Sequence, residues 1–199
     1  MSGNEMVRAA GAVGCTSEKM KEALRLWGQM YDDKPPWAGG QVKTLNLPAA
    51  IASETARMTT VEMKSEVSGG ARGKFLDQMY QPVLERLRPF VEYGCAKGGL
   101  VMKPYVSGGR ILVDFVQADC FYPTSFDASG RVSGAVFAGQ VRRDGKIYTR
   151  LEKHELTGDG GCRVTNRAFA SRTEGTLGKE VPLGEVTEWA ALASEVTLQ

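Results

Sequence analysis

The stretch that decides the fold is residues 132–156, which read VSGAVFAGQVRRDGKIYTRLEKHEL. Two runs of alternating residues, Val132–Arg143 and Lys146–Leu156, are joined there by Asp144-Gly145. An Asp-Gly pair between two such runs is the strongest short-range signal for a β-hairpin, because a tight two-residue turn needs positive φ at both positions. The stretch therefore predicts two long antiparallel strands.

Shorter runs on either side extend this sheet. Upstream, Leu100–Val106 and Arg110–Val116 flank a Ser-Gly-Gly turn, which predicts a second hairpin. Downstream, Arg163–Ser171 follows the turn residues Gly158–Gly161 and predicts a fifth strand. We therefore expect an antiparallel sheet of hairpins over about residues 100–171.

Before Gly99 the apolar residues recur every three or four positions, as they do on a helix. The pattern predicts helices over about residues 17–32, 47–67 and 74–97. Pro82 and Pro89 fall inside the third, where each removes a backbone donor, so we expect a kink or a second helix that begins at Pro82. In the second helix, one stripe holds Leu47, Ile51, Met58 and Val61.

Helices followed by antiparallel strands predict an α+β fold. Residues 1–15 are expected to form a flexible N-terminus, and residues 16–199 a single domain with a helical part over 16–98 and a sheet part over 99–199. At the end of the chain, Glu185–Val196 predicts a C-terminal helix, because Trp189 and Leu192 lie three residues apart.

The composition excludes some kinds of partner. The 199 residues include 25 Lys and Arg against 23 Asp and Glu, and a net charge of +2 argues against holding nucleic acid by bulk charge alone. No apolar run approaches the ~18–20 residues that a membrane span needs, so no membrane partner is expected. Four widely spaced cysteines without a Cys-x-x-Cys pair are typical of thiols in a reducing compartment.

No group of catalytic residues emerges from the sequence. His154 is the one histidine, which excludes a metal site built from several histidines. A Cys–His nucleophilic pair would have to use His154, and we expect instead an exposed histidine on a strand. The glycine-rich run at residues 68–75 lacks the Ser or Thr that follows the lysine of a phosphate-binding loop, since Phe75 follows Lys74. We predict no catalytic residue, no metal, no cofactor and no enzyme activity.

Positive charge is concentrated between Arg131 and Arg172, where nine Lys and Arg residues stand against four acidic ones. Tyr148, Phe137 and Phe169 lie between these charges. Such a face suits a nucleic-acid backbone or a carboxylate-rich protein, although the solvated outer face of a sheet is the simpler interpretation. The candidate contact residues are Arg142, Arg143, Lys146 and Arg150.

A second candidate surface is the aromatic cluster of Trp27, Tyr31 and Trp37 around Pro35-Pro36. Trp and Tyr concentrate where one surface buries another, so the cluster could anchor an interface. The alternative is a local core in which the end of the first helix folds back. The sequence leaves both interpretations open.

Several motifs follow one another in a set order. Trp27-Gly28-Gln29-Met30-Tyr31 precedes Pro36-Trp37, and the helix that follows carries Arg57 and an embedded glutamate, Glu62. Later come Gly99–Tyr105, Ile111–Pro123 with its Phe-x-Pro turn, Asp127–Val132, Tyr148–His154 and Val164–Phe169. This ordered set resembles the portal proteins of tailed bacteriophages over about residues 20–192.

The resemblance implies a structural subunit without enzyme activity. Portal subunits form a ring, usually of about twelve copies, at one vertex of the capsid, where DNA enters and leaves. The implied partners are other copies of the chain, the packaging motor, the capsid and tail-connector proteins, and the packaged DNA. The implied location is the portal vertex of the virion, and the host cytoplasm during assembly.

Portal proteins of this kind are commonly more than twice as long, so we expect this chain to be the outer wing portion at the N-terminus of such a subunit. Contacts with neighbouring subunits or DNA would use the aromatic cluster, Arg57 with Glu62, and the basic strand residues. The alternative is a small nucleic-acid-binding module that uses the basic sheet face over residues 131–172.

Overall fold

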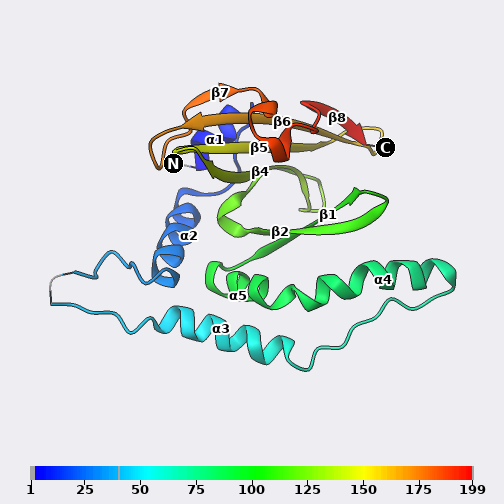
Figure 1. The fold of residues 1–199 in the computed structure, drawn as a ribbon. Coiled ribbons are helices and arrows are strands. Elements are labelled where there is room, and N and C mark those ends of the chain that lie inside the picture. The colour runs from blue at the N-terminus through cyan, green and yellow to red at the C-terminus, as the bar shows by residue number, and fades with distance from the viewer. Residues whose placement is uncertain (1–2, 40, 199) are drawn as a thin grey trace. The chain divides into compact units, whose positions relative to one another are not determined.

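A computed structural model describes residues 3–39 and 41–198, which fall into two compact units. The sheet unit comprises Met1–Glu18 and Cys120–Gln199, and the helical unit comprises Lys19–Asp119. The fold is α+β, as predicted (Figure 1). The division differs from the single domain expected over residues 16–199, because the residues before Lys19 join strands from the second half of the chain.

The sheet unit is a six-stranded antiparallel sheet with a short helix against it (Figure 1). The strands lie in the order β3-β4-β5-β6-β7, and β8 also pairs with β6. The predicted central hairpin is confirmed, with Asp144 and Gly145 at φ of 52° and 69°. The elements are α1 (Gly3–Ala9), β3 (Phe121–Phe126), β4 (Val132–Arg143), β5 (Lys146–Leu156), β6 (Cys162–Ser171), β7 (Lys179–Val181) and β8 (Glu195–Leu198).

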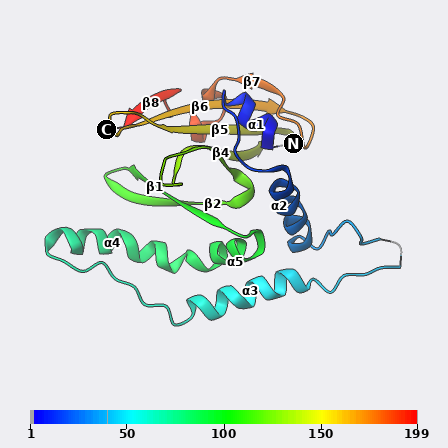
Figure 2. The same cartoon turned by 180° about the vertical axis from the view of Figure 1, so that it is seen from behind.

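Helix α1 covers one face of this sheet (Figure 2). Its Met6 and Val7 pack with Val136, Leu151 and Phe169 from β4, β5 and β6, and all five side chains are buried. The expectation of a flexible N-terminus over residues 1–15 is therefore wrong for α1. The helix is ordered because its apolar side chains find partners more than a hundred residues away in the sequence, which local patterning does not reveal.

The opposite face of the sheet is covered by the segment that contains Val186 and Trp189. Both are buried with Tyr148 of β5 and Ala168 of β6. The segment forms two short 3₁₀ turns, Leu183–Glu185 and Thr187–Trp189, with Val186 extended between them (φ −114°, ψ 118°). These turns and the extended residue anchor the end of the chain on the sheet.

The predicted C-terminal helix over residues 185–196 is wrong, because the described part of the chain ends in strand β8. Extended Val186 is fully buried, and that conformation interrupts any helix there. Glu195–Leu198 then gains more by pairing with Cys162–Thr165 of β6 than by continuing as an isolated turn of helix.

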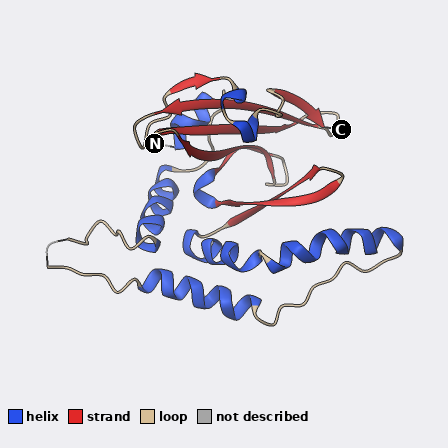
Figure 3. Cartoon of the chain, viewed as in Figure 1, coloured by secondary structure: helices blue, strands red, loops and turns tan. Residues whose placement is uncertain are grey.

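The helical unit consists of helices with one hairpin packed against them (Figure 3). The hairpin β1–β2 is confirmed, but it forms a two-stranded sheet of its own, so the sheet expected over residues 100–171 is divided. Phe115 of β2 stacks on Phe90 of α5, with ring centroids 4.2 Å apart. The elements are α2 (Glu18–Tyr31), α3 (Leu47–Thr60), α4 (Ala71–Glu85), α5 (Leu87–Lys97), β1 (Leu100–Ser107) and β2 (Arg110–Gln117).

The third predicted helix is divided into α4 and α5 at Arg86 (φ −98°, ψ −2°). The break does not fall at Pro82, which lies inside α4. It places Pro89 in the first turn of α5, where backbone N–H groups have no acceptor within the helix and a missing donor costs little. Among the described residues, no helix combines the length and the apolar character that crossing a bilayer would require.

Candidate functional site

Helix α3 turns its larger apolar side chains away from its own unit. It packs along α5 (Figure 1), and Ala52 and Ala56, one turn apart, are its buried residues. On the opposite side of the helix the apolar side chains are more than half exposed: Leu47 at 55%, Ile51 at 65%, Met58 at 67% and, at the C-cap directly after Thr60, Val61 at 64%. An amphipathic helix ordinarily does the reverse, so this exposed apolar face is a candidate interaction surface.

These exposed residues, together with Glu54, form what we name the α3 stripe. Leu47, Ile51, Glu54, Met58 and Val61 follow one another at steps of four, three, four and three, which is the repeat of a coiled-coil seam. A seam with this spacing presents one continuous stripe to a second helix. The α3 stripe therefore has the spacing of a helix-packing surface, and its apolar residues are exposed.

Arg57 holds the one charged residue of the α3 stripe. Its guanidinium donates to both carboxylate oxygens of Glu54, at 2.6 and 2.8 Å, and this pairing holds the pKa of the Glu54 carboxyl below its usual range. Glu62, which the sequence placed on the same helix, lies beyond the last helical residue, Thr60, and is exposed. The structure therefore gives Arg57 a place beside the stripe and leaves Glu62 in the following loop.

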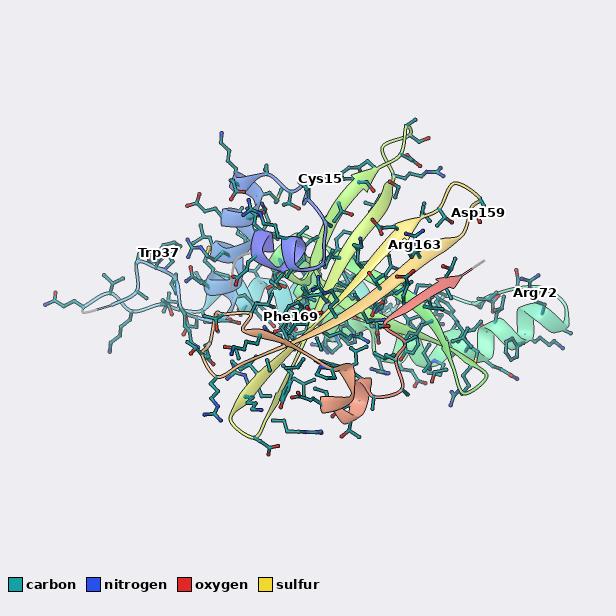
Figure 4. All side chains as sticks on the ribbon, turned by 90° about the horizontal axis from the view of Figure 1, so that it is seen from above. Cys15, Trp37, Arg72, Asp159, Arg163 and Phe169 are labelled. Atoms are coloured by element: carbon teal, nitrogen blue, oxygen red, sulfur yellow. The ribbon has the colours of Figure 1, made fainter. Side chains whose placement is uncertain are left out.

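Trp37 lies on the loop that leads into α3 and is 56% exposed (Figure 4). Together with Met30, Pro35 and Leu47 it lines a shallow hollow of about 260 Å³. Since Leu47 is also the first residue of the α3 stripe, the hollow and the stripe adjoin. Trp37 extends the exposed apolar surface of the helical unit beyond α3.

Trp27 and Tyr31 are placed differently, against the end of α5. The Trp27 ring lies over Gly98, where an added Cβ would come within 2.9 Å of it. The Tyr31 hydroxyl donates to Glu92 Oε1 at 2.7 Å, and its ring meets Tyr93 edge-on. Burial and the Glu92 carboxylate raise the pKa of Tyr31. The predicted aromatic cluster is thus divided: Trp27 and Tyr31 support local packing, and Trp37 faces outward.

An open groove of about 920 Å³ lies between the end of α3 and α4. Its charged lining residues balance in sign, with three basic and three acidic side chains. The basic ones are Arg57, Lys64 and Arg88, and the acidic ones are Glu66, Asp77 and Glu85. A groove with this mixture does not select a ligand of one charge.

The loop beside the groove explains why α3 ends at Thr60 and not near residue 67, as expected. Asp77 of α4 accepts the backbone N–H of Val67 at 2.9 Å, and Gln81 donates to the Ser65 carbonyl at 3.1 Å. The backbone donor lowers the pKa of Asp77. The loop gains these bonds from side chains ten and sixteen residues further along the chain, so the local helical pattern is overridden.

The basic strand residues do not form one face. Alternation along the strands places Arg142 on the side of the sheet that α1 covers, and Arg143, Lys146 and Arg150 on the other. The arginines pair with acids of the same chain: Arg142 with Glu174 at 2.6 Å, Arg143 with Glu188 at 3.1 Å, and Arg150 with Glu152 at 2.9 Å. Lys146 lies over the Tyr148 ring, 5.8 Å from its centroid.

The aromatic residues between these charges do not form an exposed surface either. Tyr148 and Phe169 are each buried, on opposite faces of the sheet. A surface that stacks bases needs exposed rings along a positively charged groove. The basic sheet face predicted over residues 131–172 is thus largely neutralised and lacks these two rings.

Two further observations bear on chemistry. Within residues 3–39 and 41–198, no three His, Cys, Asp or Glu side chains gather as they would around a metal ion. His154, expected to be exposed, is half-buried and hydrogen-bonded to Glu152. The sequence did not predict this contact. It also did not predict that the α3 stripe faces outward, although the small residues Ala52 and Ala56 on the opposite side of the helix indicated which side could pack closely.

No protein-family model matches the chain, and no curated protein or solved structure matches it.

Proposed function

We propose that this chain is a structural subunit of a ring of the portal type found in tailed bacteriophages, and that it acts by contacts between copies and not by catalysis. The observation that carries the assembly role is the exposed α3 stripe. The order of motifs in the sequence supports the portal class. On this proposal the chain supplies the outer wing of the ring at the capsid vertex, through which DNA passes.

The α3 stripe is large enough to drive association. Its apolar members are Leu47, Ile51, Met58 and Val61, and each is more than half exposed. Full burial of an aliphatic side chain of this size contributes about 1.5–3 kcal/mol. Four such residues in one seam, with Trp37 nearby, exceed the scattered single hydrophobic residues that ordinary surfaces carry.

A closed ring needs two different surfaces that meet head to tail. The α3 stripe supplies one apolar surface. The ion pair between Glu54 and Arg57 supplies a polar contact within it that fixes the register of a partner helix. The intramolecular pairs of Arg142, Arg143 and Arg150 leave little free charge for a contact between neighbours. On this proposal, contacts between ring subunits are made by the helical unit in preference to the basic strands.

The experiment is the mass in solution, measured by light scattering on a sizing column over a range of concentrations. We expect the mass to rise above the 21.5 kDa of one chain as the concentration increases. The variant Ile51→Glu/Met58→Glu places two charges in the α3 stripe and is expected to return the mass to one chain.

The matched control is Val13→Glu/Val106→Glu, which changes two other exposed apolar residues (81% and 74%) outside the α3 stripe. It is expected to keep the mass of the wild type. A wild-type mass of one chain at every concentration contradicts the assembly role. If the chain assembles, negative-stain microscopy decides the class: closed rings support a portal-type subunit, whereas dimers or open chains contradict it.

A further inference from the structure

One end of the β5–β6 hairpin brings a thiol, an imidazole and a carboxylate onto the same face of the sheet. Glu152, His154 and Leu156 alternate along β5, and Leu156 pairs with Cys162 of β6. Cys162 is thus the diagonal neighbour of His154 on that face. The turn between the strands fixes this register, because the Asp159 carboxylate accepts both the Thr157 hydroxyl and the Gly161 backbone N–H.

The three groups form a chain of contacts. His154 Nε2 lies 2.6 Å from Glu152 Oε1, and His154 Nδ1 lies 3.9 Å from Cys162 Sγ. A carboxylate beside one ring nitrogen favours the tautomer with its hydrogen on that nitrogen, which leaves the other nitrogen as an acceptor. Nδ1 therefore presents its lone pair to the thiol.

The imidazole and the carboxylate are both held in place. The Phe137 ring meets the His154 ring edge-on, with centroids 5.1 Å apart. The second carboxylate oxygen of Glu152, Oε2, pairs with Arg150 at 2.9 Å, so the arginine fixes the carboxylate that orients the histidine. Glu152 and His154 have side chains only 11% and 27% exposed, which limits their motion.

We propose that Cys162 is a nucleophilic modification site for small carbon electrophiles that carry a leaving group, with His154 as its base and Glu152 as the residue that positions the base. A nucleophile within reach of a base, with that base oriented by a third group, is the arrangement that activates cysteine. In the reaction, the Sγ proton passes to His154 Nδ1, a bond forms between Sγ and the electrophilic carbon, and the leaving group departs with its electron pair. The site is independent of the assembly role proposed above.

The test uses iodoacetamide on the whole chain at pH 7, with the alkylation rate of each cysteine followed by peptide mass spectrometry. Iodide is then the leaving group. Cys15 and Cys95 are exposed and serve as internal references, whereas Cys162 is half-buried. A free thiol is only a few per cent thiolate at this pH, so we expect Cys162 to react about ten-fold faster than Cys15 in spite of its lower exposure.

Two variants separate activation from loosening of the sheet. His154→Gln is expected to reduce the Cys162 rate to that of an ordinary thiol or below, and Glu152→Gln to reduce it by a smaller factor. Cys120, also half-buried and in the same unit, reports the packing, because a loosened sheet would raise its rate. Leu156→Ala, a change beside Cys162 that leaves the base in place, is the matched control and should keep the fast rate.

Either of two results overturns the proposal. One is a wild-type Cys162 that reacts no faster than Cys15. The other is a fast Cys162 whose rate does not fall in His154→Gln, since the histidine would then have no part in it. A slower Cys162 with an unchanged Cys120 supports the proposal, because a purely structural effect would move both.

Discussion

The two units differ sharply in where they keep their apolar side chains. In the sheet unit, both faces of the central strands are covered, and large residues such as Leu151, Phe169 and Trp189 are buried. In the helical unit, the buried hydrophobic residues among those described are Ala52, Ala56 and Leu87. Its larger apolar side chains are for the most part partly or fully exposed.

The difference shows how the two units obtain their stability. The sheet unit completes its core with residues of its own chain. Helix α1 covers one face of the sheet, and Val186 and Trp189 cover the other. The helical unit has less apolar burial to offset its conformational entropy. Local opening should therefore be easier there, and contact with a partner should stabilise this unit more than the other.

The largest expected effect comes from the core of the sheet unit. Leu151 is 1% exposed at the centre of β5, and Leu151→Ala should lower the free energy of unfolding by about 2–5 kcal/mol through lost burial and a cavity. Ile51→Ala on the exposed face of α3 should change it by less than about 0.5 kcal/mol in the monomer. Urea unfolding measures both, and equal effects would remove the contrast between the units.

A smaller effect tests whether the helical unit has any tight packing. Gly98 has φ of 76°, and an added Cβ would lie 2.9 Å from the Trp27 ring, whereas Gly145 has φ of 69° and open space around it. Both alanine variants should cost about 1–2 kcal/mol for the left-handed backbone. Gly98→Ala should cost more, by the displacement of Trp27. Equal losses in thermal stability would mean that Trp27 is loosely held.

A third effect concerns the hydroxyl of Tyr31. Tyr31→Phe removes its hydrogen bond to Glu92 and should cost about 0.5–1.5 kcal/mol near neutral pH. Because burial and Glu92 raise the pKa of Tyr31, folding favours the protonated form. The stability difference between wild type and variant should therefore be present below pH 10.0, the ordinary tyrosine value, and shrink as the pH rises above it.

Denaturant unfolding at several pH values measures this difference for Tyr31. Tyr105→Phe, which changes an exposed tyrosine of the same unit, is the control and should show little change at any pH. A difference for Tyr31→Phe that grew above pH 10.0 would contradict the assigned direction of the pKa shift.

The smallest effect is at the surface of the sheet unit. Arg167 and Glu180 pair across β6 and β7, and the pairing lowers the pKa of Glu180. A double-mutant cycle to alanine should give a coupling of about 0.2–1 kcal/mol, and the more exposed pair Arg142–Glu174 should give less. The Glu180 contribution is present above its ordinary value of 4.5 and should be lost as the pH falls below it. A coupling that survives at pH 2 would contradict the ion pair.

The sequence predicted those helices and strands that are determined by residues close together in the chain. The Asp144-Gly145 turn defined the central hairpin to the residue, and the alternating runs defined β1 and β2 closely. The elements that were missed depend on distant partners. Helix α1 needs β4, β5 and β6 to bury Met6 and Val7, and β8 needs the edge of β6.

The candidate site followed the same rule. The sequence showed that Leu47, Ile51, Met58 and Val61 share a stripe, because helical spacing is local. The small residues Ala52 and Ala56 were the one local sign that the stripe faces outward, but the side of α3 that meets α5 is determined by packing between helices and not by the helical spacing. In the same way, the contact of His154 with Cys162 depends on the register of β5 and β6, which the turn at residues 157–161 sets.

The outer edge of β6 has a consequence for solubility at high concentration. Its ten residues are shared between two short segments, β7 beside Ala168–Ala170 and β8 beside Cys162–Thr165, and the Asn166 backbone N–H between them donates to the Ser194 carbonyl. Long unpaired edges are templates for fibril growth. On this side the sheet ends in strands of three and four residues. This edge of the sheet therefore offers little template on which strands of another copy could pair.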